Sequence, residues 1–237
     1  MMEGVFLDLP DFGGSVLYVG EECTPVIIFD DFFWSADKLS HMAPAEHEFS
    51  APPKGGYPGI RAALPESYID EVLRYINPTL RQVYEIPDEV QCCGQYGVYS
   101  LVCTPEKNLS VFQCVPHTDT RRQYYFAILH YLSSDDHGGT GFYRHVPTGF
   151  ERISEDRYSE FMSTAKSHID KCGLPPIKYL TSGDNHFELI HTVAYKKGRL
   201  LVYPGNLLHS GLINNEADIN SNPETGRLTA NIFIDHK

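Results

Sequence analysis

Three side chains in this sequence could hold one divalent metal ion together. His117 and Asp119 stand two residues apart, so in an extended strand their side chains lie on the same face. His209 follows far downstream, directly before Ser210 and Gly211. Two histidines and one carboxylate form the facial ligand set of non-haem ferrous iron, which leaves three octahedral positions open for chemistry. The residue types therefore predict a ferrous site made by His117, Asp119 and His209.

A short motif such as His-x-Asp recurs by chance, so an incidental or structural role is the default for it when it stands alone. Eight histidines besides His117, His130 and His209 have no supporting spacing, and we expect them to be solvated or hydrogen-bonded. His137 and His145 flank a glycine-rich segment and could form a rival metal site. No carboxylate accompanies them in a matching strand motif, so the sequence favours the first set.

The elements that would position these residues are mostly strands. Strand-like segments are expected near 25–29, 90–103, 123–132 and 228–235, with a hairpin formed by 186–195 and 199–203. Apolar residues at helical spacing predict one helix, or two joined near Pro78, over 66–84, and another helix near 154–173 whose apolar stripe is core. Many strands with a few helices predict an α+β fold in which two sheets pack face to face and helices support one side.

Composition limits the classes of protein and partner. The chain has 237 residues, 42% of them hydrophobic, which is ample for a packed core. Its net charge of -12 would repel phosphate backbones, so nucleic acid is not an expected partner. The opening residues show no secretory signal, and no apolar run is long enough to span a membrane. Six cysteines without C-x-x-C spacing are expected to be free, mostly buried thiols, so we expect a cytoplasmic location.

Several motifs in one order resemble a known family. They are His117-Thr118-Asp119, Leu129-His130-Tyr131-Leu132, the glycine-rich 138–142, and 197–204 followed by His209-Ser210-Gly211. Together they resemble the iron(II) and 2-oxoglutarate-dependent dioxygenases, specifically the prolyl-4-hydroxylase-like branch. The resemblance covers about 90–235 and, more weakly, 25–32. It implies a double-stranded β-helix, or jelly roll: a single domain over 1–237, with N-terminal strands and supporting helices in 1–88 and the catalytic core in 89–237.

The resemblance also implies roles for individual residues. His117, Asp119 and His209 would bind iron(II), and Arg227 would bind the far carboxylate of the co-substrate 2-oxoglutarate, with dioxygen as the second co-substrate. A guanidinium suits that task because it can bond both carboxylate oxygens and stays charged when buried. Arg227 lies 18 residues past His209 (227 − 209), longer than the interval usual in the family. His130 stands where the family often places a tyrosine for the same carboxylate, and Asn231 shares the strand face of Arg227.

The expected activity is hydroxylation of an unactivated carbon in an amino acid, a peptide side chain or a small metabolite. Asp119 fills the position that a halide occupies in halogenating relatives, so halogenation is disfavoured, while desaturation stays open. Two alternatives remain: a non-catalytic jelly-roll module that binds a ligand or protein, and a cupin-like metalloenzyme that needs no 2-oxoglutarate. The sequence leaves the substrate and the oligomeric state open, a homodimer included.

Overall fold

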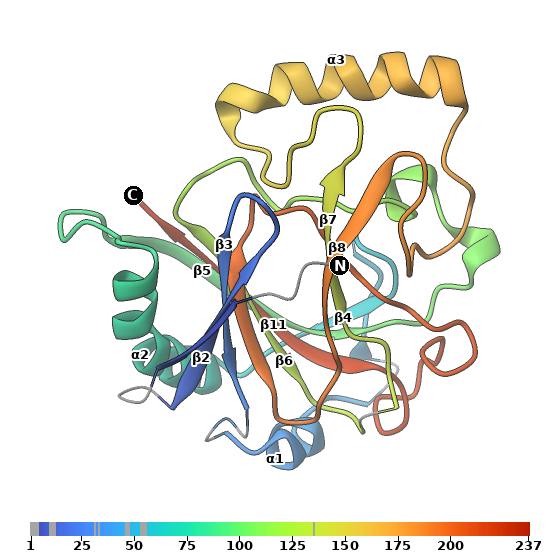
Figure 1. Cartoon of the computed structure of the whole chain (residues 1–237). Helices are drawn as coiled ribbons and strands as arrows, with labels where there is room; N and C mark the ends of the chain where they lie inside the picture. The colour runs from blue at the N-terminus through green and yellow to red at the C-terminus, as the bar shows by residue number, and fades with distance from the viewer. Residues whose placement is uncertain are drawn as a thin grey trace.

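The computed structural model describes residues 5–9, 13–30, 32, 34–45, 48–52, 56–134 and 136–237 (Figure 1). The predicted loop over 44–60 falls partly outside the described residues, at 46–47 and 53–55. So do residue 31 of the weakly matching opening segment, residue 135 beside the glycine-rich segment, and the opening residues 1–4. The described chain is built on two antiparallel sheets with helices placed around them.

The larger sheet has eight strands and the smaller one has three. The order across the larger sheet is β1 (Val5–Leu9), β2 (Gly14–Val19), β3 (Thr24–Phe29), β9 (Leu200–Pro204), β6 (Tyr125–Tyr131), β11 (Leu228–His236), β5 (Cys92–Leu101) and β4 (Ile60–Ala63). The smaller sheet has the order β10 (His209–Gly211), β7 (Thr140–His145) and β8 (Phe187–Val193). A bridge between His117 and His209 adds one more segment to the edge of the smaller sheet.

The path of the chain between the sheets defines the fold. From β5 in the larger sheet the chain passes to the His117 segment in the smaller one, then to β6 in the larger, to β7 and β8 in the smaller, and on through β9, β10 and β11 in alternation. The result is two facing arrays of four, β5-β11-β6-β9 and the His117 segment-β10-β7-β8. This is the jelly-roll arrangement of a double-stranded β-helix, and the predicted fold class is confirmed.

The helices differ in how they join the core. Besides α1 (Ala36–His41) and two 3-10 turns at Glu106–Asn108 and Val111–Gln113, the chain forms α2 (Glu66–Val83) and α3 (Glu155–Cys172). α2 is one continuous helix with Pro78 inside it, and it buries Tyr68, Val72, Ile76 and Leu80 in the core cluster that it shares with the larger sheet. Among the described helices, none is long and apolar enough to cross a membrane.

Three expectations about local structure are wrong. No residue of α3 is buried, so its apolar stripe is not core. The strands near 186–195 and 199–203 do not form a hairpin, because β8 pairs with β7 while β9 pairs with β3 and β6 in the other sheet. Of the six cysteines only Cys114 is buried, and the others are exposed or partly exposed. Each error concerns burial or strand pairing, which the spacing of residues along the sequence does not determine.

Candidate functional site

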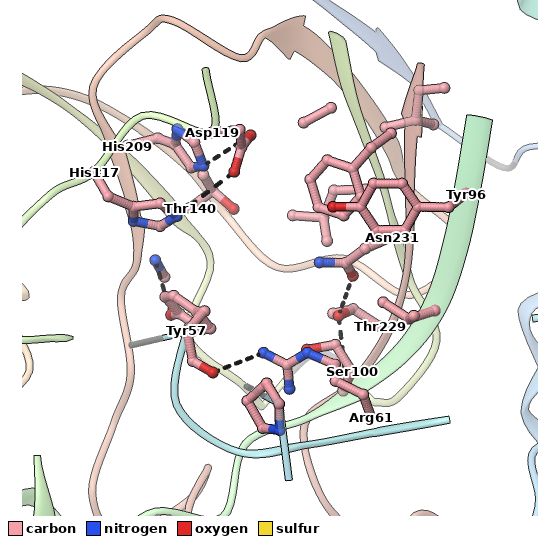
Figure 2. Close-up of a pocket in the computed structure, with 18 of the residues that line it drawn as sticks. Tyr57, Arg61, Tyr96, Ser100, His117, Asp119, Thr140, His209, Thr229 and Asn231 are labelled. Carbon is pink, nitrogen blue, oxygen red and sulfur yellow. Dashed lines mark hydrogen bonds and ion pairs between the residues drawn. The ribbon is translucent and has the colours of Figure 1, made fainter. Parts of the chain in front are cut away.

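The three predicted ligands meet at the edge of the smaller sheet. His117 and His209 exchange backbone hydrogen bonds of 3.0 Å in both directions, and the Asp119 N–H donates to the Gly205 carbonyl at 2.7 Å. The Asp119 carboxylate lies 3.8 Å from Nε2 of His117 and 3.7 Å from Nε2 of His209. One ligand atom from each residue falls within 4.8 Å of the others. Figure 2 shows the three side chains gathered on one side of a pocket.

The chemistry of this group fits a divalent cation. Oδ2 of Asp119 is buried and accepts no hydrogen bond from the described residues. Burial raises the pKa of Asp119 and lowers the pKa of His117, as expected for charged forms taken from water without a compensating ion. Nδ1 of His209 lies 2.8 Å from the Leu207 carbonyl, which can only accept, so Nδ1 carries the proton and Nε2 keeps its lone pair for a metal.

The group borders a cavity of about 520 Å³ between the two sheets. β11 contributes Thr229 and Asn231 to its lining, and Arg227, the residue directly before β11, continues the same alternation. In Figure 2, Thr229 and Asn231 lie across the cavity from the metal-binding group. The side chains that could bind a metal and those that could bind an anion therefore face the same space.

Arg227 is held firmly with part of its guanidinium left free. The residue is 4% exposed, and its Nε and Nη2 donate to the Gly138 and Gly139 carbonyls at 2.7 and 3.2 Å. The rings of Tyr131 and Tyr195 lie 5.9 and 5.4 Å from its central carbon. Within the described chain, Nη1 makes no hydrogen bond. Arg227 is thus placed to offer Nη1 to an anion in the cavity, and its role as a co-substrate ligand stays a prediction.

A buried carboxylate fixes the glycines that hold Arg227. Asp218 is fully buried and accepts from Nδ1 of His137 at 2.8 Å, from the Asn214 N–H at 2.7 Å and from the Gly138 N–H at 3.2 Å. A side chain at Gly138 would collide with the Leu212 carbonyl, so only glycine allows this approach. Through Asp218, the long segment between His209 and Arg227 therefore fixes the position of Gly138, whose carbonyl binds Arg227. Sequence reasoning missed Asp218, since no motif marks it.

The rival metal site does not form. His137 pairs with Asp218, whereas Nδ1 of His145 lies 2.8 Å from Oγ1 of Thr148. Neither belongs to a group of metal-ligating side chains within the described ranges. Both histidines have hydrogen-bonding roles, as the default interpretation holds.

A second arginine reaches the cavity from the edge strand β4. Arg61 donates from Nη1 to the Ile60 carbonyl at 2.9 Å and from Nη2 to the Tyr57 carbonyl at 3.1 Å. Burial lowers its pKa, and the positive charge of Arg227 nearby contributes to the same shift. Figure 2 shows Arg61 at the border of the cavity. Among the described residues of its lining there are two guanidinium groups and one carboxylate, that of Asp119, so the cavity is suited to a dianion although the whole chain is strongly acidic.

His130 is not at the site, which corrects the sequence assignment. It is fully buried on the opposite face of β6, where its Nδ1 lies 2.9 Å from the Tyr68 hydroxyl of α2. Successive strand residues face opposite sides, and on β6 Ala127 and Leu129 face the cavity. The next residue, Tyr131, lies against Arg227 and hydrogen-bonds Thr140. The assignment of His130 to the co-substrate is therefore wrong, because its side chain faces away from the cavity.

Asn231 does line the cavity, on the strand face shared with Arg227 as expected. Its Oδ1 accepts from the Thr229 hydroxyl at 2.7 Å, so its amide nitrogen can donate into the cavity. Its role in binding the co-substrate remains a prediction.

Residues 10–234 match a protein family described as "Family of unknown function (DUF6445)", and the chain belongs to that family. No curated protein sequence matches the chain.

Solved structures similar to the chain include HygX from Streptomyces hygroscopicus with nickel, 2-oxoglutarate and hygromycin B bound. It is 14% identical, with 90% of this chain and 83% of that chain covered and a TM-score of 0.45. Another is the viral collagen prolyl hydroxylase of Paramecium Bursaria Chlorella virus-1 in complex with 2-oxoglutarate, at 14% identity, 88% and 94% coverage and a TM-score of 0.44. A third is EvdO2 from Micromonospora carbonacea var. aurantiaca with 2-oxoglutarate, at 12% identity, 100% and 94% coverage and 0.42.

Proposed function

We propose that this protein is an iron(II)- and 2-oxoglutarate-dependent oxygenase. The observation that carries the proposal is one cavity with a His-Asp-His ligand set on one side and Arg227 and Arg61 in the same lining. A dicarboxylate that chelates a metal at one end and meets a guanidinium at the other fits this division of charge. The motif order of the sequence supports the same assignment.

Each residue has a defined task in this proposal. His117, Asp119 and His209 hold iron(II), which supplies the redox chemistry for the overall conversion of substrate C–H, dioxygen and 2-oxoglutarate to C–OH, succinate and carbon dioxide. Nη1 of Arg227 binds the far carboxylate of 2-oxoglutarate, and Arg61 adds positive charge. Asn231 and Thr229 offer polar groups beside that carboxylate. Because Asp119 fills a ligand position, we assign hydroxylation in preference to halogenation.

The two alternatives lack comparable support. A binding module without a metal leaves unexplained the buried Asp119 oxygen, which has no hydrogen-bond partner among the described residues and which a cation would satisfy. A metalloenzyme that does not use 2-oxoglutarate has no need for Arg227 and Arg61 in the same cavity as the metal. A single co-substrate that binds both the metal and the arginines accounts for their presence in one cavity.

The test uses the purified chain, loaded anaerobically with iron(II) and then exposed to dioxygen and 2-oxoglutarate. We expect succinate to form in proportion to the 2-oxoglutarate consumed, even without added substrate, at a slow uncoupled rate. Consumption of dioxygen without 2-oxoglutarate would favour the cupin-like alternative. Metal and 2-oxoglutarate binding without any turnover would favour the binding module.

A further inference from the structure

A second cavity, of about 1020 Å³, lies between α3 and the end of the smaller sheet, and we name it the α3 cavity. It shares Gly56, Tyr57 and His117 with the pocket between the sheets. Its other walls are α3, the segment around the second 3-10 turn, and the start of β8. A candidate metal ligand is therefore part of the wall between the two spaces.

The apolar stripe of α3 faces this cavity. The stripe has helical spacing and consists of Tyr158, Phe161, Met162, Ala165 and Ile169, all of which line the α3 cavity. None is buried, and Met162 is 47% exposed. Across the cavity Phe112 is 81% exposed. Large apolar surface left open around a concave space is typical of a binding site for a ligand or a partner.

The α3 cavity carries almost no charge. None of the 31 acidic residues of the chain contributes to its described lining, and Lys166, which is exposed, is the one lysine or arginine there. His145 is neutral near pH 7, because burial lowers its pKa to about 4, with a smaller contribution from His168 and His186. Such a lining offers nothing to compensate the cost of removing a cationic group from water.

We propose that the α3 cavity binds the organic substrate of the oxygenase through an uncharged, predominantly apolar group. This inference rests on the proposed function, because the shared wall at His117 and Tyr57 is what places the bound group beside the metal. The dianionic co-substrate is matched to the pocket with the two arginines, so the two ligands occupy spaces of opposite character. Phe161, Met162 and Ile169 are then residues that determine substrate specificity.

Binding is tested without metal or 2-oxoglutarate, using the neutral fluorescent probe N-phenyl-1-naphthylamine. We expect saturable binding of one probe per chain. Met162→Glu places a carboxylate on the cavity wall and should weaken the affinity at least about tenfold, since burying an unpaired charge beside an apolar group is unfavourable. Met162 is half exposed, so the substitution should leave the fold intact, as the melting temperature would verify. The matched control is Leu174→Glu, which alters an exposed residue outside the cavity and should bind the probe normally.

Non-saturable binding, or equal affinity in the Met162 and Leu174 variants, would overturn the inference. So would a dimer of the chain that Met162→Glu dissociates and Leu174→Glu does not, because the stripe would then be an interface. A second arm measures how neutral aromatic compounds and their primary-amine analogues accelerate 2-oxoglutarate consumption. We expect acceleration by the neutral compounds, and selective acceleration by the amines would contradict the inference. Uncoupled 2-oxoglutarate consumption reports the proposed function separately, so each idea can fail alone.

Discussion

The two cavities that meet at His117 are built in different ways. The pocket between the sheets takes several of its polar side chains from paired strands, and Arg227, directly before β11, is fixed by two carbonyls and lies near two aromatic rings. The α3 cavity is apolar, and its principal wall is a helix with no buried residue. Precise geometry is supplied by rigid strands, whereas choice of substrate can reside in a segment that changes without disturbing the metal ligands.

The largest effect should come from a ligand of the metal. Asp119→Ala removes the carboxylate of the candidate triad, so iron(II) affinity should fall by more than about 100-fold, because losing only a hydrogen-bond partner of a ligand typically costs 10–100-fold. Equilibrium dialysis with iron(II) under anaerobic conditions measures it. Asp170→Ala, on the exposed surface of α3, is the control and should bind normally. Unchanged iron(II) binding in the Asp119 variant would show that the pocket between the sheets is not the metal site.

The two arginines should differ in importance. Arg227→Met should weaken 2-oxoglutarate binding roughly 100-fold, the equivalent of about 3 kcal/mol for a charge-assisted contact in a buried site. Arg61→Met should cost about tenfold, since carbonyls of its own strand and loop already engage it. Calorimetric titration of the metal-loaded chain measures both, with the partly exposed Arg121→Met as control. A larger loss for Arg61 would reverse the assignment of the carboxylate site.

A smaller effect should come from Asp218, which acts through the support of Arg227. Asp218→Asn keeps the size of the side chain but weakens the bonds that fix Gly138. We expect 2-oxoglutarate affinity to fall about fivefold and stability to fall by about 2 kcal/mol. Metal affinity should stay unchanged, and this difference separates a positioning role from general unfolding. Equal losses of both affinities would mean that Asp218 merely supports the fold.

The smallest effect concerns the attachment of α3. The His145 ring stacks edge-on against Phe161 of α3 at 4.7 Å between ring centroids, and its pKa is lowered to about 4 in the fold. The unfolded chain therefore binds a proton at this residue below about pH 6.5 while the folded chain does not, so stability is present above that pH and is lost as pH falls toward 4. We expect a contribution of about 1 kcal/mol after allowance for solvent screening.

His145→Gln tests that contribution, because glutamine can still bond Thr148 but does not titrate. Urea unfolding at pH 7 and pH 5 should show a smaller pH-dependent loss in the variant than in the natural chain. A pH dependence equal in both would place the titration elsewhere in the chain.

Much of the pocket between the sheets could be predicted, because the residue types and their spacing along the sequence indicate it. The two-residue spacing of His117 and Asp119 predicts that their side chains share a face, and the same spacing rule predicts that Asn231 shares the face of Arg227. The predicted role of His130 was wrong for a physical reason. The strand β6 is buried on both faces, so its sequence has no alternation of polar and apolar residues to tell which face a side chain takes.

The rest of the site depends on contacts that local spacing does not carry. Arg61 lies on a four-residue edge strand after an irregular loop, and Asp218 lies in the long segment that looked like a departure from the family pattern. The apolar stripe of α3 is a second feature whose contacts the sequence does not reveal. Its spacing predicts a helix with an apolar face, but says nothing about whether protein or ligand covers that face.

The central claim is that one co-substrate joins the metal group to the arginines across a single cavity. Calorimetric titration of 2-oxoglutarate into the chain, with and without bound manganese(II) as a redox-stable substitute for iron(II), tests it most directly. We predict one 2-oxoglutarate per chain, bound at least about tenfold more tightly when the metal is present and poorly by Arg227→Met in either state. Binding that ignores the metal, or that Arg227→Met leaves unchanged, would contradict the account.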